Sequence, residues 1–150
     1  LARRRVRKTY LALVTAAPEP PEGEIATALS EGRLRTTPSP EGKEALTRYR
    51  LVEKLPRAAL LEVEPLTGRM HQIRVHLASI GHPVLGDPTY GATGTVKAPR
   101  LFLHAARIEL PHPEGGRPLT IECPLPPDWF VFAGDGPVQR QGRGSLPEGS

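Results

Sequence analysis

Two arginines and three histidines lie close together in residues 66–91, LTGRMHQIRVHLASIGHPVLGDPTYG. Zinc binding is the first chemistry to test, because histidines four positions apart on a helix can bind one metal ion together. His71 and His76 are five positions apart, which on a helix turns their side chains about 140° away from each other. We therefore predict no metal site in this segment.

Nucleophilic and phosphate-cradling chemistry find little support in the sequence. No glycine-rich elbow surrounds a serine, and the single cysteine, Cys123, has no histidine-paired context, so we interpret it as a small buried hydrophobe. The glycines after residue 80 are not followed by a lysine at the spacing of a phosphate-binding loop. The remaining signal is a basic segment beside turn-rich loops, with a second basic cluster, RRRVRK, near the N-terminus. That combination suits an RNA backbone.

The composition is that of one soluble globular domain with a basic surface. The chain has 150 residues, a net charge of +4 and a pI of about 9.6. One cysteine rules out an internal disulfide, and no apolar run approaches the roughly 20 residues of a membrane span. We expect a cytoplasmic protein without a membrane partner. Few large apolar residues follow residue 132, so we predict one domain over residues 1–132 and a disordered tail over residues 133–150.

Alternation of apolar and polar residues predicts strands on both sides of the histidine-rich segment. Residues 8–14 alternate so that Tyr10, Ala12 and Val14 share one face. Residues 45–55 and 58–66 alternate around a short LPR turn and predict a β-hairpin. Two further strands are predicted in residues 100–110 and 118–126. Residues 15–24 and 34–43 are rich in turn formers and predict connections.

One helix of about three turns is predicted after Thr67 and Gly68. Gly81 stands where a helix C-cap is expected, and Arg74 lies beside the apolar stripe, close to the edge of the core. Strands combined with this helix predict an α+β fold. The apolar residues that recur at helical spacing are Met70, Ile73, Leu77 and Ile80.

Four segments of the chain resemble motifs of the RluA-type RNA pseudouridine synthases, in the order in which that family carries them. GRMHQIRVHLASIGHPVLGDPTYG is similar to the family's typical GRTHQIRVHLAAIGHPIVGDPLYG. RRVRKTYLALV resembles the motif that contains the active-site tyrosine, and GKEALTRYRLVE resembles the strand that enters the hairpin. RLFLHAARIEL followed by CPLPPD resembles the final strands, so that the resemblance covers about residues 3–130.

The resemblance implies both a fold and a reaction. The implied fold is a mixed, mainly antiparallel sheet with flanking helices, here as a partial pseudouridine synthase fold. In this family an aspartate attacks the uridine, and the base detaches, turns over and rejoins the ribose through carbon, without a metal or organic cofactor. The implied partner is ribosomal or transfer RNA, and the full-length enzyme is expected to be a monomer.

Five residues match the family's site motifs. Tyr10 matches the active-site tyrosine, which packs on the flipped target base. Arg74 matches the basic residue that pairs with the catalytic aspartate, where a guanidinium can orient the carboxylate and keep it ionised. Arg69, His71 and Gln72 belong to the same motif and are candidates for substrate binding. For His71 and Gln72 a structural hydrogen-bonding role stays equally open.

The family's nucleophile stands in a motif of the form HRLDxxTSG, which no segment of this chain matches. The three aspartates are Asp87, Asp128 and Asp135, and Asp87 matches a loop residue that stabilises a turn. His104 is interpreted as a packed, hydrogen-bonded strand histidine.

We therefore expect the C-terminal portion of a synthase catalytic domain, inactive alone, in which Arg74 has lost its acidic partner. Two alternatives stay open: a non-catalytic RNA-binding remnant, and one half of a split synthase.

Overall fold

A six-stranded sheet forms the centre of the chain in the computed structural model, which describes residues 6–91 and 98–129. Its strand order is β2-β5-β6-β1-β7-β8, and every described pairing is antiparallel. The tail predicted over residues 133–150 lies outside the described residues. The strands of this sheet are β1 (Arg7–Val14), β2 (Glu22–Ile25), β5 (Thr47–Lys54), β6 (Ala59–Pro65), β7 (Leu103–Pro111) and β8 (Pro118–Glu122).

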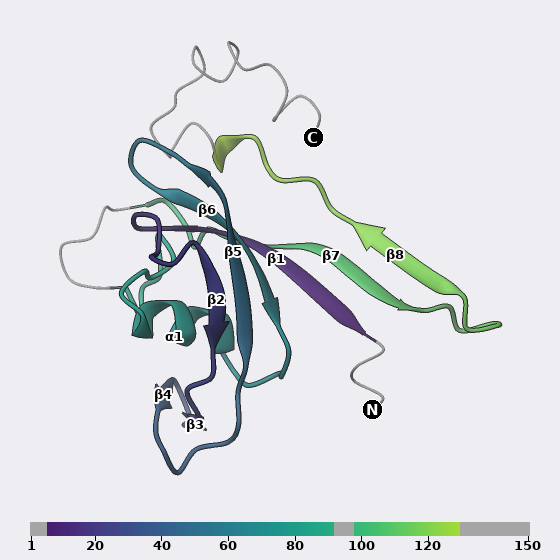
Figure 1. Ribbon diagram of the computed structural model, residues 1–150, viewed down its shortest axis with the longest axis horizontal. Coiled ribbons are helices and arrows are strands. Elements are labelled where there is room, and N and C mark those ends of the chain that lie inside the picture. Colours follow the sequence, from purple (N-terminus) through teal and green to yellow (C-terminus); the bar gives the residue numbers. More distant parts are fainter. Residues whose placement is uncertain (1–5, 92–97, 130–150) are drawn as a thin grey trace.

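A small second sheet and one helix lie beside the large sheet. The small sheet pairs β3 (Leu29–Glu31) with β4 (Thr36–Pro38), and the helix is α1 (Gln72–Ser79). Figure 1 shows α1 beside the large sheet with β3 and β4 beneath it, while β7 and β8 extend away on the other side. The predicted α+β class with a mainly antiparallel sheet is confirmed. No helix in the described ranges is long and apolar enough to cross a membrane.

Strand β1 shows how sequence alternation positions the candidate site. Ala12 and Val14 are fully buried, and Tyr10 packs against the same core cluster, as the alternation predicts. Tyr10 lies opposite Val63 of β6, while the pairing with β7 shifts register between Thr9 and Tyr10. Such a bulge increases the local twist of a strand and is common beside active sites.

Helix α1 covers the face of the sheet that carries this core. Ile73 and Leu77 pack in one buried cluster with core residues of β1 and β6, which confirms the middle of the predicted apolar stripe. The ends of the stripe were wrong, because Met70 precedes the helix and Ile80 is exposed. Full burial of one such aliphatic side chain contributes about 1.5–3 kcal/mol. This packing fixes α1 against β1 and β6, so the residues at the start of the helix lie near Tyr10.

The helix is shorter than predicted. It begins at Gln72 because His71 has φ 54° and ψ 24°, a left-handed backbone conformation through which an α-helix cannot run. At the other end Ile80 is the C-cap, and Gly81 follows with φ 87°. The predicted glycine stop is therefore confirmed.

The predicted hairpin is confirmed as β5 and β6, which pair from Thr47 opposite Pro65 to Lys54 opposite Ala59. The connections predicted over residues 15–24 and 34–43 were partly wrong, because each contains residues of a short strand. Strand β2 pairs with β5, and β4 pairs with β3. Strands of three or four residues depend on a partner strand more than on their own alternation, so their sequence carries little signal.

The two strands predicted in residues 100–110 and 118–126 are confirmed as β7 and β8. Cys123 follows β8 and is exposed, so the prediction of a buried cysteine was wrong. The β7–β8 hairpin extends beyond the core, and most of β8 is exposed. His104 donates from Nε2 to the carbonyl of Cys123 at 2.9 Å, and its ring packs edge-on against Trp129. These contacts confirm its structural interpretation.

Candidate functional site

A pocket of about 760 Å³ opens between β1, the end of β6 and the start of α1. It brings together residues from separate parts of the sequence, because α1 packs across the strands that include β1. The segment that enters β7 adds apolar side chains to the wall of the pocket. All five residues selected from the sequence line this pocket: Tyr10, Arg69, His71, Gln72 and Arg74.

Tyr10 supplies the aromatic wall of the pocket. Its side chain is partly buried against the core cluster and partly exposed to the pocket. A tyrosine ring has an apolar body and a polar hydroxyl, so it can pack on a flat ligand and still reach a polar group. Lys8, two positions earlier on the same strand, adds an exposed cation to the same wall.

Arg74 is held in the pocket wall by a two-point ion pair with Asp87. Nε of Arg74 donates to Oδ2 at 3.0 Å, and Nη2 donates to Oδ1 at 2.8 Å. The arginine side chain is 15% exposed and the aspartate side chain is 0% exposed. Because both donors of the fork are engaged, the guanidinium plane has a fixed direction.

The pair shifts the pKa of both partners away from their ordinary values. The hydrogen bond to Asp87 raises the pKa of Arg74 and outweighs the opposing effect of burial. Burial alone raises the pKa of Asp87, but hydrogen bonds from Arg74 and from the backbone N–H groups of Tyr90 and Thr89 bring that pKa below its ordinary value. Both side chains are therefore charged at neutral pH.

The expectation that Arg74 is left without an acidic partner was wrong, because Asp87 forms a two-point ion pair with it. The reason is structural: the loop after α1 turns back so that Asp87 lies beside the helix. The fork uses Nε and Nη2 of Arg74, which leaves Nη1 outside the ion pair. Since Arg74 lines the pocket, the N–H groups that Asp87 does not engage are the candidates to meet a bound acceptor.

Neither aspartate in the described ranges is placed to act as a nucleophile. Oδ1 of Asp87 accepts hydrogen bonds from Arg74 and from the N–H groups of Thr89 and Tyr90, and Oδ2 accepts from Arg74. These contacts confirm the predicted turn role of Asp87. Asp128 is ion-paired with Arg100 and is not among the residues that line the pocket.

Gln72 and Arg69 line the pocket but are largely engaged within the protein. The amide nitrogen of Gln72 donates to the carbonyl of Leu46 and to Oγ1 of Thr47, both at 2.9 Å. Its amide oxygen accepts from the Arg69 backbone N–H and from Thr67. Nε of Arg69 donates to the carbonyl of Glu44 at 2.8 Å, which anchors that side chain. Both side chains therefore line the pocket while hydrogen bonds within the protein anchor them.

Tyr90 is a residue of the site that sequence reasoning missed. Its hydroxyl lies 2.8 Å from Nδ1 of His71 and 2.8 Å from the backbone nitrogen of Thr36. The guanidinium carbons of Arg74 and Arg35 each lie 5.1 Å from the centre of its ring. These partners are distant in sequence, so no local spacing could indicate them.

His76 is part of a buried structural network rather than a metal site. Nδ1 lies 2.7 Å from Oγ1 of Thr47, and Nε2 donates to the carbonyl of Thr27 at 2.8 Å. Burial lowers the pKa of His76, although the Thr27 bond opposes this effect, so the ring is neutral at neutral pH. Within residues 6–91 and 98–129 no three His, Cys, Asp or Glu residues lie close enough to hold a metal ion.

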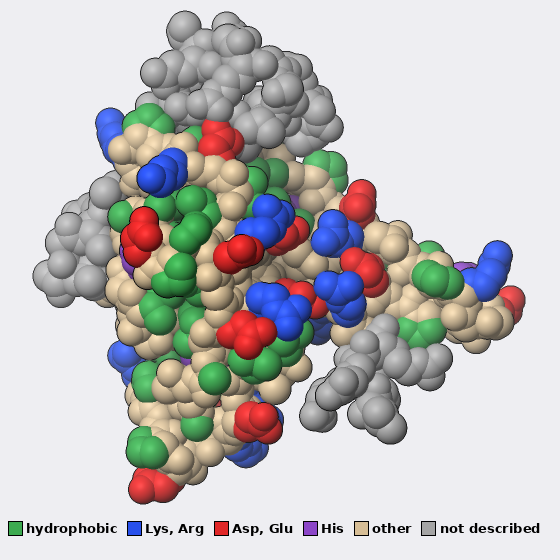
Figure 2. All heavy atoms as spheres, viewed as in Figure 1, with side chains coloured by type: hydrophobic (Ala, Val, Ile, Leu, Met, Phe, Trp, Pro, Cys, Tyr) green, Lys and Arg blue, Asp and Glu red, His purple; other side chains and the backbone are tan. Residues whose placement is uncertain are grey.

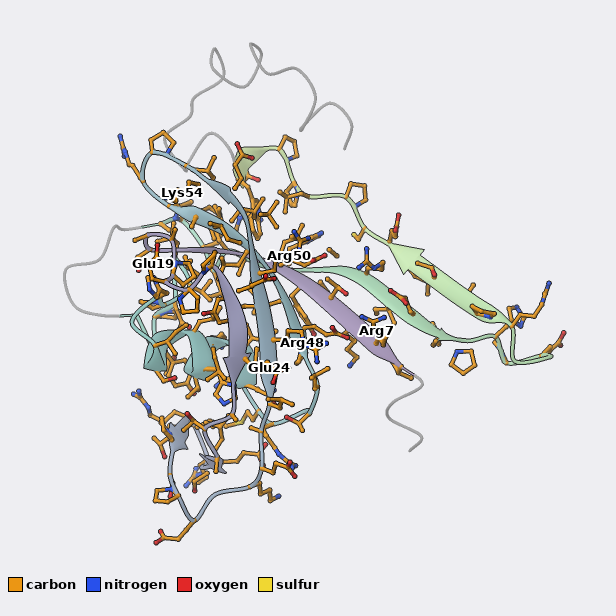
Figure 3. The ribbon with its side chains drawn as sticks, viewed as in Figure 1. Arg7, Glu19, Glu24, Arg48, Arg50 and Lys54 are labelled. Atoms are coloured by element: carbon orange, nitrogen blue, oxygen red, sulfur yellow. The ribbon has the colours of Figure 1, made fainter. Side chains whose placement is uncertain are left out.

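The opposite face of the sheet carries a second set of charges, which we name the paired-charge ladder and of which Arg7 and Glu64 also line the pocket. Figure 2 shows basic and acidic side chains intermixed on this face, and Figure 3 shows Arg48 and Arg50 on β5 and Arg7 on β1. Arg50 lies 2.7 Å from Glu62, and Arg48 lies 3.1 Å from Glu24. The members of the ladder are Arg7, Glu24, Arg48, Arg50, Glu62, Glu64, Arg107 and Glu109.

Comparison with known proteins agrees with the fold. The family model described as RNA pseudouridylate synthase matches residues 1–79, a range that includes Tyr10 and Arg74. The chain belongs to the RNA pseudouridylate synthase family. An uncharacterised RNA pseudouridine synthase of Chloroflexus aurantiacus is 45% identical over 129 residues, which are 83% of this chain and 40% of that protein.

Other family members show the same relation. Ribosomal large subunit pseudouridine synthase D of Nitrosomonas europaea is 43% identical over 139 residues, which are 85% of this chain and 40% of the relative. The structure of human RNA pseudouridylate synthase domain containing 1 superposes with a TM-score of 0.72 at 29% identity, over 83% of this chain and 58% of that one. The chain thus spans about 40% of the length of these two curated relatives.

Proposed function

We propose that this chain supplies the tyrosine and arginine side of the active site of an RNA pseudouridine synthase that acts on uridine in ribosomal RNA. The observation that carries the proposal is that Tyr10 and Arg74, which match two family motifs, line one pocket. Family membership supports the reaction, and the relatives named for the large ribosomal subunit favour ribosomal over transfer RNA.

In the proposed reaction the C1′–N1 bond of uridine breaks and a C1′–C5 bond forms, while the proton on C5 is lost and N1 gains one. The product has the composition of the substrate, and no electron is transferred overall, so the reaction needs no redox cofactor. A flipped uracil packs on the ring of Tyr10, as aromatic side chains hold extruded bases. The hydroxyl of the same tyrosine takes part in removing the C5 proton.

Arg74 orients and ionises the attacking carboxylate in this proposal. Asp87 fixes the guanidinium through Nε and Nη2, and Nη1 makes no hydrogen bond within residues 6–91 and 98–129, so we propose that it donates to a second carboxylate. A positive charge at hydrogen-bond distance favours the ionised form of that carboxylate. We propose that the nucleophile is an aspartate outside these 150 residues, because the three aspartates of the chain stand in no HRLDxxTSG motif.

We propose in addition that the complete enzyme is cytoplasmic and monomeric. The relatives named for the large ribosomal subunit support the location. Light scattering on the complete protein tests the monomer, and a particle of twice the chain mass contradicts it.

A chimeric enzyme tests the proposed reaction. Residues 6–129 replace the matching segment of the Nitrosomonas europaea relative, and pseudouridine formation in large-subunit ribosomal RNA is measured. We expect product from the chimera, little from its Tyr10→Leu version and full activity from its Lys54→Ala version, since Lys54 does not line the pocket. A folded, RNA-binding chimera without activity contradicts the proposal.

The unfused 150-residue chain is the second arm of the same experiment. We expect it to bind the RNA and to form no pseudouridine. Pseudouridine formed by the chain alone contradicts the proposal of an external nucleophile.

A further inference from the structure

The Tyr90 hydroxyl has a defined hydrogen-bond direction. The backbone N–H of Thr36 donates to it at 2.8 Å, so this oxygen is the acceptor in that bond. The hydroxyl carries one proton of its own, and Nδ1 of His71 lies 2.8 Å away. A tyrosine hydroxyl that accepts one bond can donate its proton to a second partner. An arrangement in which Nδ1 of His71 accepts that proton satisfies both groups.

A neutral histidine whose Nδ1 accepts must carry its proton on Nε2. His71 lines the pocket, whereas Tyr90 does not. Nδ1 is directed toward Tyr90, and because the two ring nitrogens point in diverging directions, the Nε2–H is directed away from Tyr90.

The backbone of His71 supports a specific role for this side chain. With φ 54° it is in the left-handed region, which non-glycine residues rarely adopt and in which Asn, Asp and His are the more frequent exceptions. As N-cap of α1 it makes no side-chain cap hydrogen bond, because its ring is directed to Tyr90. Unusual backbone conformations of this kind concentrate at functional sites.

Tyr90 also contacts Arg74, a second hydrogen-bond donor that lines the pocket, and its partner Asp87. Its backbone N–H donates to Oδ1 of Asp87 at 3.0 Å, and its ring lies under the guanidinium of Arg74 at 5.1 Å. Arg35 lies at the same distance from the ring and donates to the Thr89 carbonyl. Two guanidinium groups thus lie near the ring, while Thr36 holds its hydroxyl.

We propose that Tyr90 is a positioning residue that fixes His71 as an Nε2–H donor to an oxygen acceptor of RNA bound in the pocket. The acceptor is either a base carbonyl or a phosphate oxygen. This inference rests on the proposed RNA-binding function, but its first test does not.

The first test is nuclear magnetic resonance of the chain with ¹⁵N-labelled histidine at a pH where His71 is neutral. We expect a single Nε2–H form of His71 with a coupling from the Tyr90 hydroxyl proton to Nδ1. The Tyr90→Phe variant keeps the ring and is expected to lose that coupling. A wild-type His71 protonated on Nδ1 overturns the inference, whether or not the chain binds RNA.

The second test compares two substitutions of His71 in RNA-binding assays. Gln can place its amide N–H where Nε2–H stood, while Asn reaches only the position of Nδ1. We expect His71→Asn to weaken binding about tenfold, the loss of one hydrogen bond, and His71→Gln to stay within about threefold of the wild type. Asn tolerates the left-handed backbone better than Gln, so strain predicts the opposite order. Equal affinities, or a weaker Gln variant, overturn the inference.

Two oligonucleotides of equal length distinguish the acceptors. If His71→Asn weakens the binding of oligouridylate alone, the acceptor is a base carbonyl. If it weakens the binding of an abasic strand equally, the acceptor is a phosphate oxygen. Failure of the wild-type chain to bind either strand contradicts the proposed function and the RNA contact of His71, while leaving the Tyr90–His71 hydrogen bond to the first test.

Discussion

The Arg74–Asp87 pair and the paired-charge ladder consist of the same chemical groups in different surroundings. In the pair the side chains are 15% and 0% exposed, whereas Arg7, Arg48 and Arg50 of the ladder are 54%, 53% and 55% exposed. Asp87 also accepts two backbone N–H groups, which no member of the ladder does among the hydrogen bonds of the described residues. Burial and additional hydrogen bonds separate the two sets.

The difference shows which ion pairs fix the position of a side chain. Exposed ion pairs contribute about 0–1 kcal/mol each, because water competes for both groups. A buried pair adds little compared with apolar packing, but removal of one partner leaves an uncompensated charge in the protein. The pair can therefore fix a guanidinium in the pocket wall, while the ladder keeps one face of the sheet polar and free of net charge.

The largest predicted effect is that of Asp87→Ala. The substitution leaves the Arg74 guanidinium without its partner and two backbone N–H groups without an acceptor. We expect the free energy of unfolding to fall by about 3–5 kcal/mol in urea denaturation. The double variant Asp87→Ala with Arg74→Met is the control and should recover part of the loss. A loss below about 1 kcal/mol would place the pair in the same class as the ladder.

Thr47→Val is expected to have the next largest effect. Oγ1 of Thr47 accepts from Gln72 at 2.9 Å and donates to Nδ1 of His76 at 2.7 Å. Valine has a similar shape without the hydroxyl, so the loss reports two unsatisfied buried groups, at about 1–3 kcal/mol. Thr37→Val, on the exposed part of β4, is the matched control. Equal stabilities of the two variants would show that the buried network is not needed.

Acid should destabilise the buried region in two steps. The folded pKa of His76 lies below its ordinary value of 6.5, so the unfolded chain takes up the proton first and stability falls as the pH drops below 6.5. The folded pKa of Asp87 lies below 3.8, so its contribution is present above that pH and is lost as the pH falls through the folded pKa. Thermal melts of wild type and His76→Gln between pH 7.5 and 3 check this. An unchanged slope between pH 6.5 and 5 in the variant would contradict the first step.

The smallest effect is predicted for the ladder. Arg50→Ala removes the 2.7 Å pair with Glu62, and we expect about 0.2–1 kcal/mol of lost stability. The loss should shrink further in about 1 M salt, where exposed charges are screened. A salt-insensitive loss above about 2 kcal/mol would mean that the ladder, like the buried pair, fixes the fold.

The sequence predicted those parts of the fold that local patterns encode. Strand β1, the β5–β6 hairpin and the apolar face of α1 follow from alternation or helical spacing within one segment. Strands β2 and β4 were not predicted, because strands this short depend on pairing with a partner strand. The burial of Cys123 was predicted wrongly because residue type says nothing about whether another layer covers the β7–β8 hairpin.

The residues of the candidate site likewise divide into those that the sequence motifs identified and those that depend on contacts between distant segments. Motif resemblance identified Tyr10 and Arg74, and the pocket contains both. It did not identify Asp87 as the partner of Arg74, because the family motif pairs that arginine with an aspartate elsewhere. It also missed Tyr90, whose contacts with His71 and Thr36 arise only when the loop after α1 folds back against β4.

RNA affinity of a matched pair of lysine variants tests the role of the pocket most directly. Lys8 lines the pocket and Lys54 does not, and the two substitutions by alanine remove the same charge from exposed positions of two strands. We predict that Lys8→Ala weakens binding of oligouridylate and lowers the slope of log affinity against log salt by about one, while Lys54→Ala changes neither. Equal effects of the two substitutions, or no binding by the wild-type chain at low salt, would contradict the assignment of this pocket to RNA.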